Sequence, residues 1–184
     1  KDHIAQTSGT RTFPWRAFVV AANDAQLIES ELVFKLGAPL KLEDTKWIRP
    51  GQVAWDWWNA NNIYGVDFKS GINTETYKYY IDFASKNGIE YIIIDDGWYP
   101  LGKTVLKSIP EIDVPELCRY ALSKNVGVIL WVVWNLFHDE IDEAVSLYEK
   151  WGVKGVKVDF MQRDDQKVVN FYHEATRKTA EHHL

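Results

Sequence analysis

A carboxylate near the end of the chain has two features of a catalytic nucleophile. Asp159 directly follows Gly155 to Val158, which we expect to form a buried strand, so Asp159 should lie at the exposed end of that strand. Lys157 lies two residues earlier and therefore on the same side of that strand. A cation there would lower the pKa of Asp159 and keep it ionised. An aspartate that caps the next helix explains the spacing equally well, so both interpretations stay open.

Two adjacent carboxylates and an aromatic ring form a second candidate group. Asp95, Asp96 and Trp98 follow the run Glu90 to Ile94, which is rich in β-branched residues. Adjacent strand residues point to opposite sides, so at most one of the two carboxylates faces the interior fully. Carboxylates beside a ring suit hydrogen bonds to sugar hydroxyls, with the ring stacked on the pyranose. A helix cap or a salt bridge is the alternative for either aspartate alone.

The chain has nine tryptophans, and six of them lie at the ends of apolar runs. Aromatic rings stack on the apolar faces of sugars, so this excess favours a carbohydrate ligand. Core packing is the alternative for at least one indole, and His138 is either a general acid/base or a solvated loop residue. The further candidates for sugar binding are Trp55, Asp56, Trp58, Trp131 and Asn135.

The sequence from residue 47 onward predicts four strand–helix units at intervals of roughly 30–36 residues. Buried strands are expected at 53–57, 90–94, 126–133 and 153–160. Helices are expected at 73–87, 114–124, 140–151 and 166–183, with Gly88 and Gly152 just past two of them. Such units in a row imply a parallel sheet with helices outside it.

Two architectures fit this pattern, an open doubly wound sheet and a section of a (β/α)8 barrel. Acidic and aromatic residues follow every predicted strand, which is typical of a barrel, whereas a doubly wound sheet concentrates its chemistry at one switch point. No predicted strand is followed by a glycine-rich phosphate loop. We therefore predict an α/β fold of the TIM-barrel type, with about the first four of eight units in this chain.

The length of the chain does not suit a whole barrel. A complete barrel takes about 250 residues, whereas this chain has 184 and its first 46 lack the repeat. Within those 46, residues 17–21 are strand-like and 24–36 amphipathic. We expect 1–46 to be the end of a preceding domain plus a linker, and 47–184 to be the first half of a barrel. The chain is then a fragment of a larger enzyme, or another chain supplies the missing half.

Composition excludes several classes of protein. The formal net charge is −5 with scattered basic residues, which argues against a nucleic-acid partner. Cys118 is the single cysteine, so a disulfide scaffold and a zinc ribbon are excluded. No apolar run approaches the roughly 20 residues of a membrane span, and the segment contains no signal peptide. Asp164 and Asp165 are expected to cap the last helix, and His182 and His183 to have no metal-binding role.

The motifs Trp55-x-x-Trp58, Asp95-Asp96-Gly97-Trp98 and Lys157-x-Asp159, in this order on successive strands, resemble those of α-galactosidase-type barrels. The surrounding sequence is more similar still to glycoside hydrolase family 97. The resemblance covers essentially the whole chain and rests on the segments PGQVAWDWWN, GINTETYKYYIDFASKNGIEYIIIDDGW and GVKVDFMQRDDQ. It implies that residues 1–46 leave an N-terminal β-sandwich domain.

The resemblance also implies roles for individual residues. Retaining members of the family carry an aspartate nucleophile at the position of Asp159, which inverting α-glucosidases lack. Asp95, Asp96 and Lys157 would bind hydroxyls of a galactose-like ring, and Trp58 or Trp131 would form its stacking platform. The acid/base glutamate would come from a later strand outside this chain, so these residues alone would be inactive. The resemblance further implies a calcium ion with ligands mostly outside this chain, and an exported, for example periplasmic, enzyme.

These expectations describe part of an exo-acting retaining α-galactosidase that acts on galactosides or oligosaccharides. A β-L-arabinopyranosidase or an α-glucosidase of the same family is the alternative within that class. A non-catalytic carbohydrate-binding module is the rival outside it, although a binding platform needs no Lys157–Asp159 pair. A half-barrel that dimerises into a full one is a further alternative.

Overall fold

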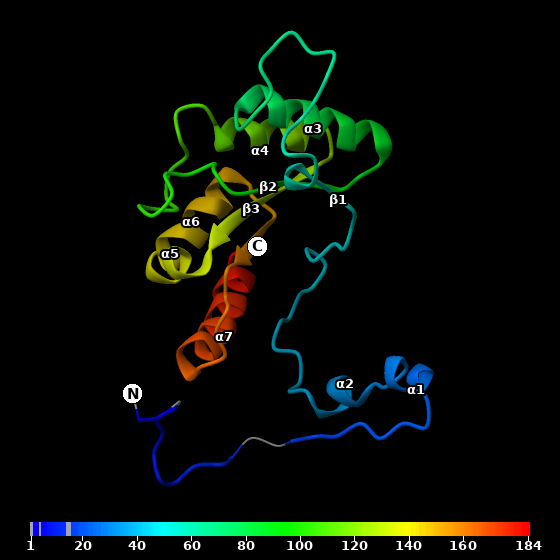
Figure 1. Cartoon of the computed structure of the whole chain (residues 1–184), viewed down its shortest axis with the longest axis vertical. Coiled ribbons are helices and arrows are strands. Elements are labelled where there is room, and N and C mark those ends of the chain that lie inside the picture. The colour runs from blue at the N-terminus through cyan, green and yellow to red at the C-terminus, as the bar shows by residue number, and fades with distance from the viewer. Residues whose placement is uncertain (1, 4, 14–15) are drawn as a thin grey trace. The chain divides into compact units, whose positions relative to one another are not determined.

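Four parallel strands form one sheet in the computed structural model, which describes residues 2–3, 5–13 and 16–184. The strands are β1 (Val53–Trp55), β2 (Tyr91–Ile94), β3 (Gly127–Val133) and β4 (Gly155–Asp159). Their order in space is β1-β2-β3-β4, with every pair parallel and no reversal (Figure 1). The predicted α/β fold with a parallel sheet is therefore confirmed.

Helices follow each strand, as the sequence predicts. They are α3 (Thr74–Asn87), α4 (Val114–Ser123), α6 (Ile141–Trp151) and α7 (Gln166–Glu181). The N-caps of α3, α4 and α7 are Asn73, Asp113 and Asp165, whose side chains each accept a hydrogen bond from a backbone amide of the first turn. Helices α3 and α6 end at glycines in the left-handed conformation, Gly88 and Gly152.

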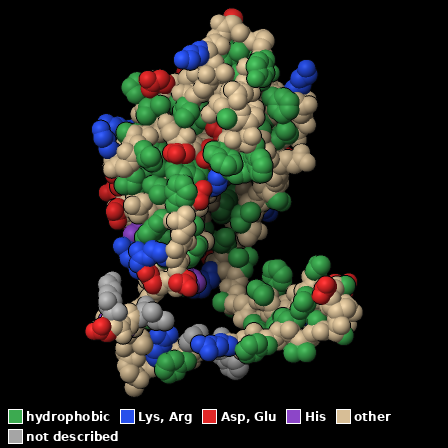
Figure 2. Space-filling view, in the orientation of Figure 1, with side chains coloured by type: hydrophobic (Ala, Val, Ile, Leu, Met, Phe, Trp, Pro, Cys, Tyr) green, Lys and Arg blue, Asp and Glu red, His purple; other side chains and the backbone are tan. Residues whose placement is uncertain are grey.

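The two faces of the sheet differ in what they contact. Ile92, Ile94, Val128 and Leu130 are at most 1% exposed, and they belong to one hydrophobic core with buried residues of α3, α4 and α6. Figure 1 shows these helices beside the sheet. The residues between them in β2 and β3 point the other way, since strand side chains alternate. The second face is only partly covered, and Figure 2 shows hydrophobic side chains on the surface of this unit around a few acidic and basic ones.

The register of β3 and β4 places several of the predicted site residues next to one another on that second face. Trp131 is the partner of Lys157, and Val133 is the partner of Asp159. The alternate residues of β4, Val156 and Val158, join the apolar core. The alternation in β4 therefore directs its valines to the core and directs Lys157 and Asp159 to the candidate site.

The structure differs from the sequence-based expectations at two strand ends. The first strand stops at Trp55, and Asp56–Asn59 form a 3-10 helix, η1. Directly after β3, Trp134–Asp139 form the short helix α5, where we expected a loop. Phe137 is fully buried on α5, so tertiary packing explains a helix too short to be stable by itself.

The first 47 residues form a compact unit of their own, Lys1–Trp47, distinct from Ile48–Leu184. It contains two short helices, α1 (Asp24–Ile28) and α2 (Leu32–Leu36), in place of one amphipathic stretch. The strand expected at 17–21 is wrong, because these residues have no strand partner. That this unit ends a β-sandwich domain stays a prediction. Among the described residues, no helix is long and apolar enough to cross a bilayer.

Candidate active site

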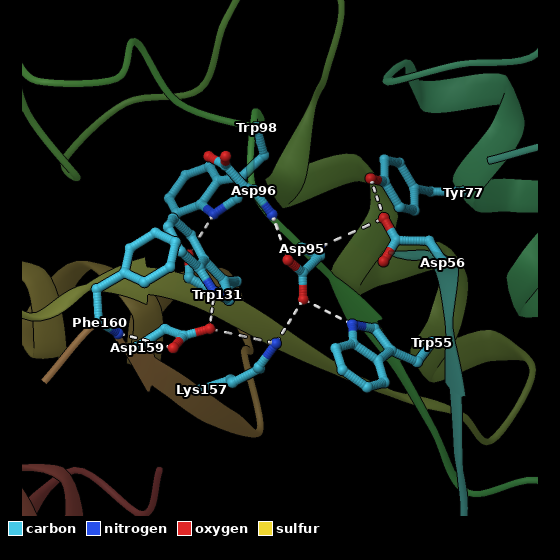
Figure 3. Close-up of polar contacts among 10 residues, drawn as sticks. All are labelled: Trp55, Asp56, Tyr77, Asp95, Asp96, Trp98, Trp131, Lys157, Asp159 and Phe160. Carbon is cyan, nitrogen blue, oxygen red and sulfur yellow. Dashed lines mark hydrogen bonds and ion pairs between the residues drawn. The ribbon is translucent and has the colours of Figure 1, made fainter. Parts of the chain in front are cut away.

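Asp159 lies at the carboxyl end of β4 and is held by three donors (Figure 3). Its Oδ2 accepts a hydrogen bond from Nε1 of Trp131 at 2.9 Å, and Nζ of Lys157 lies 3.6 Å from the same oxygen. Its Oδ1 accepts one from the backbone amide of Phe160 at 2.7 Å. The side chain is still 39% exposed, so the carboxylate is fixed in orientation yet accessible to a ligand.

These donors favour the ionised form of Asp159. The hydrogen bond from Trp131 contributes most to lowering the pKa of this carboxyl, against partial desolvation that raises it. The amide of Phe160 and the charge of Lys157 lower the same pKa further. Asp159 is therefore an anion at neutral pH, as the sequence predicts, but the main cause is an indole rather than the lysine.

Lys157 bridges Asp159 to a second carboxylate. Its Nζ lies 2.8 Å from Oδ2 of Asp95, and the same oxygen accepts a hydrogen bond from Nε1 of Trp55 at 2.6 Å. The ammonium also lies 4.1 Å from the centre of the Trp55 ring, a cation–π distance. Asp95, Lys157 and Asp159, here termed the acid–lysine cluster, thus place one cation between two anions. Such a cluster offers both donors and acceptors to a polyhydroxylated ligand.

Asp56 is not available to a ligand in this structure. It is 2% exposed, and its Oδ2 accepts a hydrogen bond of 2.6 Å from the hydroxyl of Tyr77 on α3. The backbone amide of Asp95 donates to the same oxygen at 3.4 Å, whereas Oδ1 has no hydrogen-bond partner. We had expected Asp56 to bind substrate, and its burial corrects this expectation. The side chain instead connects η1 to Tyr77 on α3 and to the backbone of Asp95, which follows β2.

Replacing Tyr77 by Phe is expected to destabilise the full-length protein by about 1–3 kcal/mol, since a buried carboxylate loses its best donor. Burial raises the pKa of Asp56 from its usual value of 3.8, and the Tyr77 hydroxyl opposes that rise. A raised folded-state pKa favours the protonated form, so stability is lost as the pH rises above 3.8. Tyr77→Phe raises this pKa further, so the loss should be larger at pH 7 than near pH 4.

Thermal unfolding of Tyr77→Phe at the two pH values measures this effect. Tyr79→Phe is the matched control, because Tyr79 lies on the same helix and is 40% exposed. An equal loss of stability at both pH values would contradict a role for the Asp56 charge.

Two of the predicted sugar-binding tryptophans are in the core. Trp98 is 0% exposed and Trp131 is 1% exposed, so neither ring offers a free face for stacking. The physical reason is that both rings belong to an aromatic cluster with Tyr99. Trp58 is 75% exposed and lies edge-on to Trp55, which leaves Trp58 as the accessible ring of the two platforms that we expected.

The remaining candidates differ in exposure and in the residues that they contact. Asp96 is exposed, and desolvation together with the charge of Asp95 raises its pKa. Asn135 is exposed on α5, and none of the hydrogen bonds and ion pairs of the described residues joins it to the acid–lysine cluster. His138 packs against Trp134 and lies 3.4 Å from a carboxylate oxygen of Glu174, so it belongs to the contact between α5 and α7.

The alternative roles that spacing left open can now be decided for several acids. Asp165, not Asp159, caps α7, so the helix-capping interpretation of Asp159 is wrong. Asp113 caps α4, which removes the same interpretation for Asp95 and Asp96. The described residues include no group of three or more His, Cys, Asp or Glu side chains placed to hold a metal ion.

Two parts of the site were missed by sequence reasoning. Phe160 has φ +61°, an unusual conformation for an aromatic residue, and its amide turns back onto the Asp159 side chain. Tyr77 donates to Asp56 from helix α3, at a position for which the sequence predicts no role in the site. Neither role leaves a signal in local sequence, because both depend on which elements pack together.

Comparison with known proteins places this geometry in a family context. The family model described as Glycoside hydrolase 97 matches residues 57–184. A retaining alpha-galactosidase of Bacteroides thetaiotaomicron is 48% identical, over 100% of this chain and 28% of that protein. A probable retaining alpha-galactosidase of Streptomyces bingchenggensis is 33% identical, over 100% of this chain and 29% of that protein. The chain thus spans less than a third of the length of these curated relatives.

Solved structures show the same similarity. A glycoside hydrolase family 97 enzyme of Pseudoalteromonas sp. strain K8, in complex with panose, matches with a TM-score of 0.73 and 25% identity, over 86% of this chain and 29% of that one. A beta-arabinopyranosidase matches with a TM-score of 0.65 and 26% identity, over 84% of this chain and 24% of that one. The four-stranded sheet and its helices are therefore similar to part of these enzymes.

Proposed function

Because this chain belongs to glycoside hydrolase family 97, we propose that it supplies the nucleophile and part of the sugar-binding site of an exo-acting retaining α-galactosidase. The observation that carries the proposal is the anionic, partly exposed Asp159 held by Trp131, Phe160 and Lys157 at the end of β4. Both curated relatives are named as retaining or probable retaining alpha-galactosidases. A platform that only binds sugar gives no reason to orient a carboxylate in this way.

The proposed reaction has two displacements. In the first, a carboxylate oxygen of Asp159 forms a bond to the anomeric carbon while the bond from that carbon to the glycosidic oxygen breaks. A carboxylic acid from outside this chain gives its proton to the departing oxygen. In the second, the resulting carboxylate takes a proton from water, the water oxygen bonds to the anomeric carbon, and the ester bond to Asp159 breaks. Both carboxylates return to their starting states.

Several parts of this proposal lie outside the chain. A retaining pair needs its two carboxyl groups about 5–5.5 Å apart, and we place the acid/base glutamate on a later strand of a complete (β/α)8 barrel. The four units with sequential strand order support that barrel. We place the calcium ion that the family resemblance implies on ligands outside this segment, since the described residues do not fit one, and no step depends on it. Export stays a prediction.

Galactose-like substrates other than galactosides are the second candidate. The similarity to a solved beta-arabinopyranosidase favours this alternative. An L-arabinopyranoside presents the same ring hydroxyl geometry without the C5 hydroxymethyl group, so the acid–lysine cluster would bind it in the same way. The α-glucosidase alternative is weaker because of Asp159.

We expect the full-length protein to release α-galactose first from an aryl α-galactoside, because two inversions at the anomeric carbon restore its configuration. Proton NMR of the anomeric region during the first minutes of hydrolysis measures this before mutarotation. An aryl β-galactoside is the matched control and should not be hydrolysed. First release of β-galactose would overturn the retaining mechanism, and a higher kcat/KM for an aryl β-L-arabinopyranoside would move the assignment to the second candidate.

A further inference from the structure

The indole of Trp131 is oriented towards the carboxylate rather than towards solvent. Its Nε1 donates to Oδ2 of Asp159 at 2.9 Å, and Figure 3 shows the indole N–H directed at that carboxylate. The ring itself is 1% exposed. A side chain so buried presents neither face of its ring to a sugar. Its Nε1 atom is the part that contacts Asp159.

The surrounding residues hold this indole in one position. Tyr99 stacks on it with ring centres 6.2 Å apart and planes 19° apart, and Phe160 lies edge-on at 5.7 Å. The backbone carbonyl of Trp131 accepts a hydrogen bond of 2.7 Å from Nε1 of the fully buried Trp98. Rotation of the Trp131 ring would therefore disturb a packed aromatic cluster, so the donor stays fixed.

The carboxylate needs such a donor because its own strand gives it little restraint. Asp159 is the last residue of β4, and the chain turns at Phe160 into the left-handed conformation. The amide of Phe160 restrains Oδ1, and Lys157 is shared with Asp95 and lies farther away, 3.6 Å from Oδ2. Trp131 is the donor from a different strand, and it determines where Oδ2 lies.

We propose that Trp131 is a positioning residue for the nucleophile, acting through its indole N–H on Oδ2 of Asp159 rather than as a stacking platform for the sugar. This inference rests on the proposed function, since it assigns a part in that reaction. A carboxylate held in one orientation is more often aligned with the anomeric carbon, and such alignment of the reacting groups lowers the barrier to reaction. A charged acceptor also makes this hydrogen bond stronger than one between neutral groups.

The test is Trp131→Phe in the full-length enzyme, which keeps an aromatic ring and removes the N–H. We expect kcat/KM for an aryl α-galactoside to fall by roughly 10–100-fold, the effect of one hydrogen bond to a charged group. Most of the fall should be in kcat, because substrate binding is not altered. The acid limb of the kcat/KM profile should move to higher pH, since Asp159 loses the donor that lowers its pKa most.

Trp151→Phe is the matched control, because that ring packs against Trp98 and Tyr148 rather than Asp159. It should change kcat/KM and the acid limb little. If Trp131→Phe lowers the melting temperature, 3-benzothienylalanine at position 131 keeps the ring shape and replaces the N–H by sulfur. A fall in activity without movement of the acid limb in either variant would show a merely structural role and overturn the inference.

A measurement without turnover separates this inference from the proposed function. In 15N-tryptophan-labelled protein, the indole resonance that disappears in Trp131→Phe should shift as the pH crosses the pKa of Asp159, and should lose this shift in Asp159→Ala. If this indole resonance shifts with pH in a protein that has no glycosidase activity, the proposed function is contradicted but the hydrogen bond from Trp131 to Asp159 is supported. If the resonance does not shift with pH in an active enzyme, the inference about Trp131 is overturned and the proposed function is not.

Discussion

Asp159→Ala in the full-length protein is expected to lower kcat/KM for an aryl α-galactoside by roughly 10³-fold or more, because the proposed mechanism assigns the glycosyl–enzyme bond to this carboxylate. Alanine removes the carboxylate but leaves room for a small anion beside Trp131 and Lys157, which keep their donors. Added azide should therefore restore part of the turnover. The product should be the β-galactosyl azide, since azide attacks from the face that Asp159 occupied and a single displacement inverts the centre.

Two further results complete this test. Asp164→Ala is the matched control, because Asp164 is exposed five residues further along the chain, and this variant should keep wild-type turnover. Thermal melting of both variants checks that the fold is intact. Turnover of Asp159→Ala close to that of wild type would remove Asp159 as the nucleophile, and an α-galactosyl azide would require a different reaction geometry.

The second large effect is expected for Lys157→Met, which removes the cation but keeps most of the length of the side chain. We expect kcat/KM to fall by about 10²–10³-fold, the usual loss for a charged group aimed at the reacting centre. The acid limb of the pH profile should also move up, because the ammonium lowers the pKa of Asp159. Asp95 loses its ion-pair partner in a site where its side chain is 7% exposed, so the protein should be destabilised by about 1–3 kcal/mol.

Lys154→Met separates this effect from a general loss of charge. Lys154 is exposed just before β4, so its replacement should change neither kcat/KM nor the pH profile. Steady-state kinetics between pH 4 and pH 8 and thermal melting are the measurements. An unchanged acid limb in Lys157→Met would contradict the electrostatic role of the lysine, even if the activity fell.

Much of the fold could be predicted because its signals are local. The β-branched run of β2 and the caps of α3 and α7 each depend on neighbours in the sequence. The place of Asp159 beyond a buried run was predictable for the same reason. Short helix α5 was not, since a six-residue helix depends on the burial of Phe137 rather than on its own propensity.

The sequence predicted which residues gather at the candidate site better than it predicted what each of them does there. Lys157 and Asp95 meet because parallel strands end at one edge of the sheet, and that follows from sequence. The burial of Asp56 and Trp131 does not follow, because it depends on which helix or ring covers each one. An aspartate or a tryptophan at a strand end can face a ligand or the core, and only the packing decides.

The pairing of β3 with β4 has a consequence for how this site could change over evolutionary time. Val156 and Val158 face the core, while Lys157 and Asp159 face the opposite side. A one-residue insertion or deletion before β4 would exchange these two sets. Both charges would enter the apolar layer, and both valines would replace them at the site. Loss of stability and loss of the proposed nucleophile would then come from the same mutation. Selection against misfolding would therefore also preserve the spacing of Lys157 and Asp159.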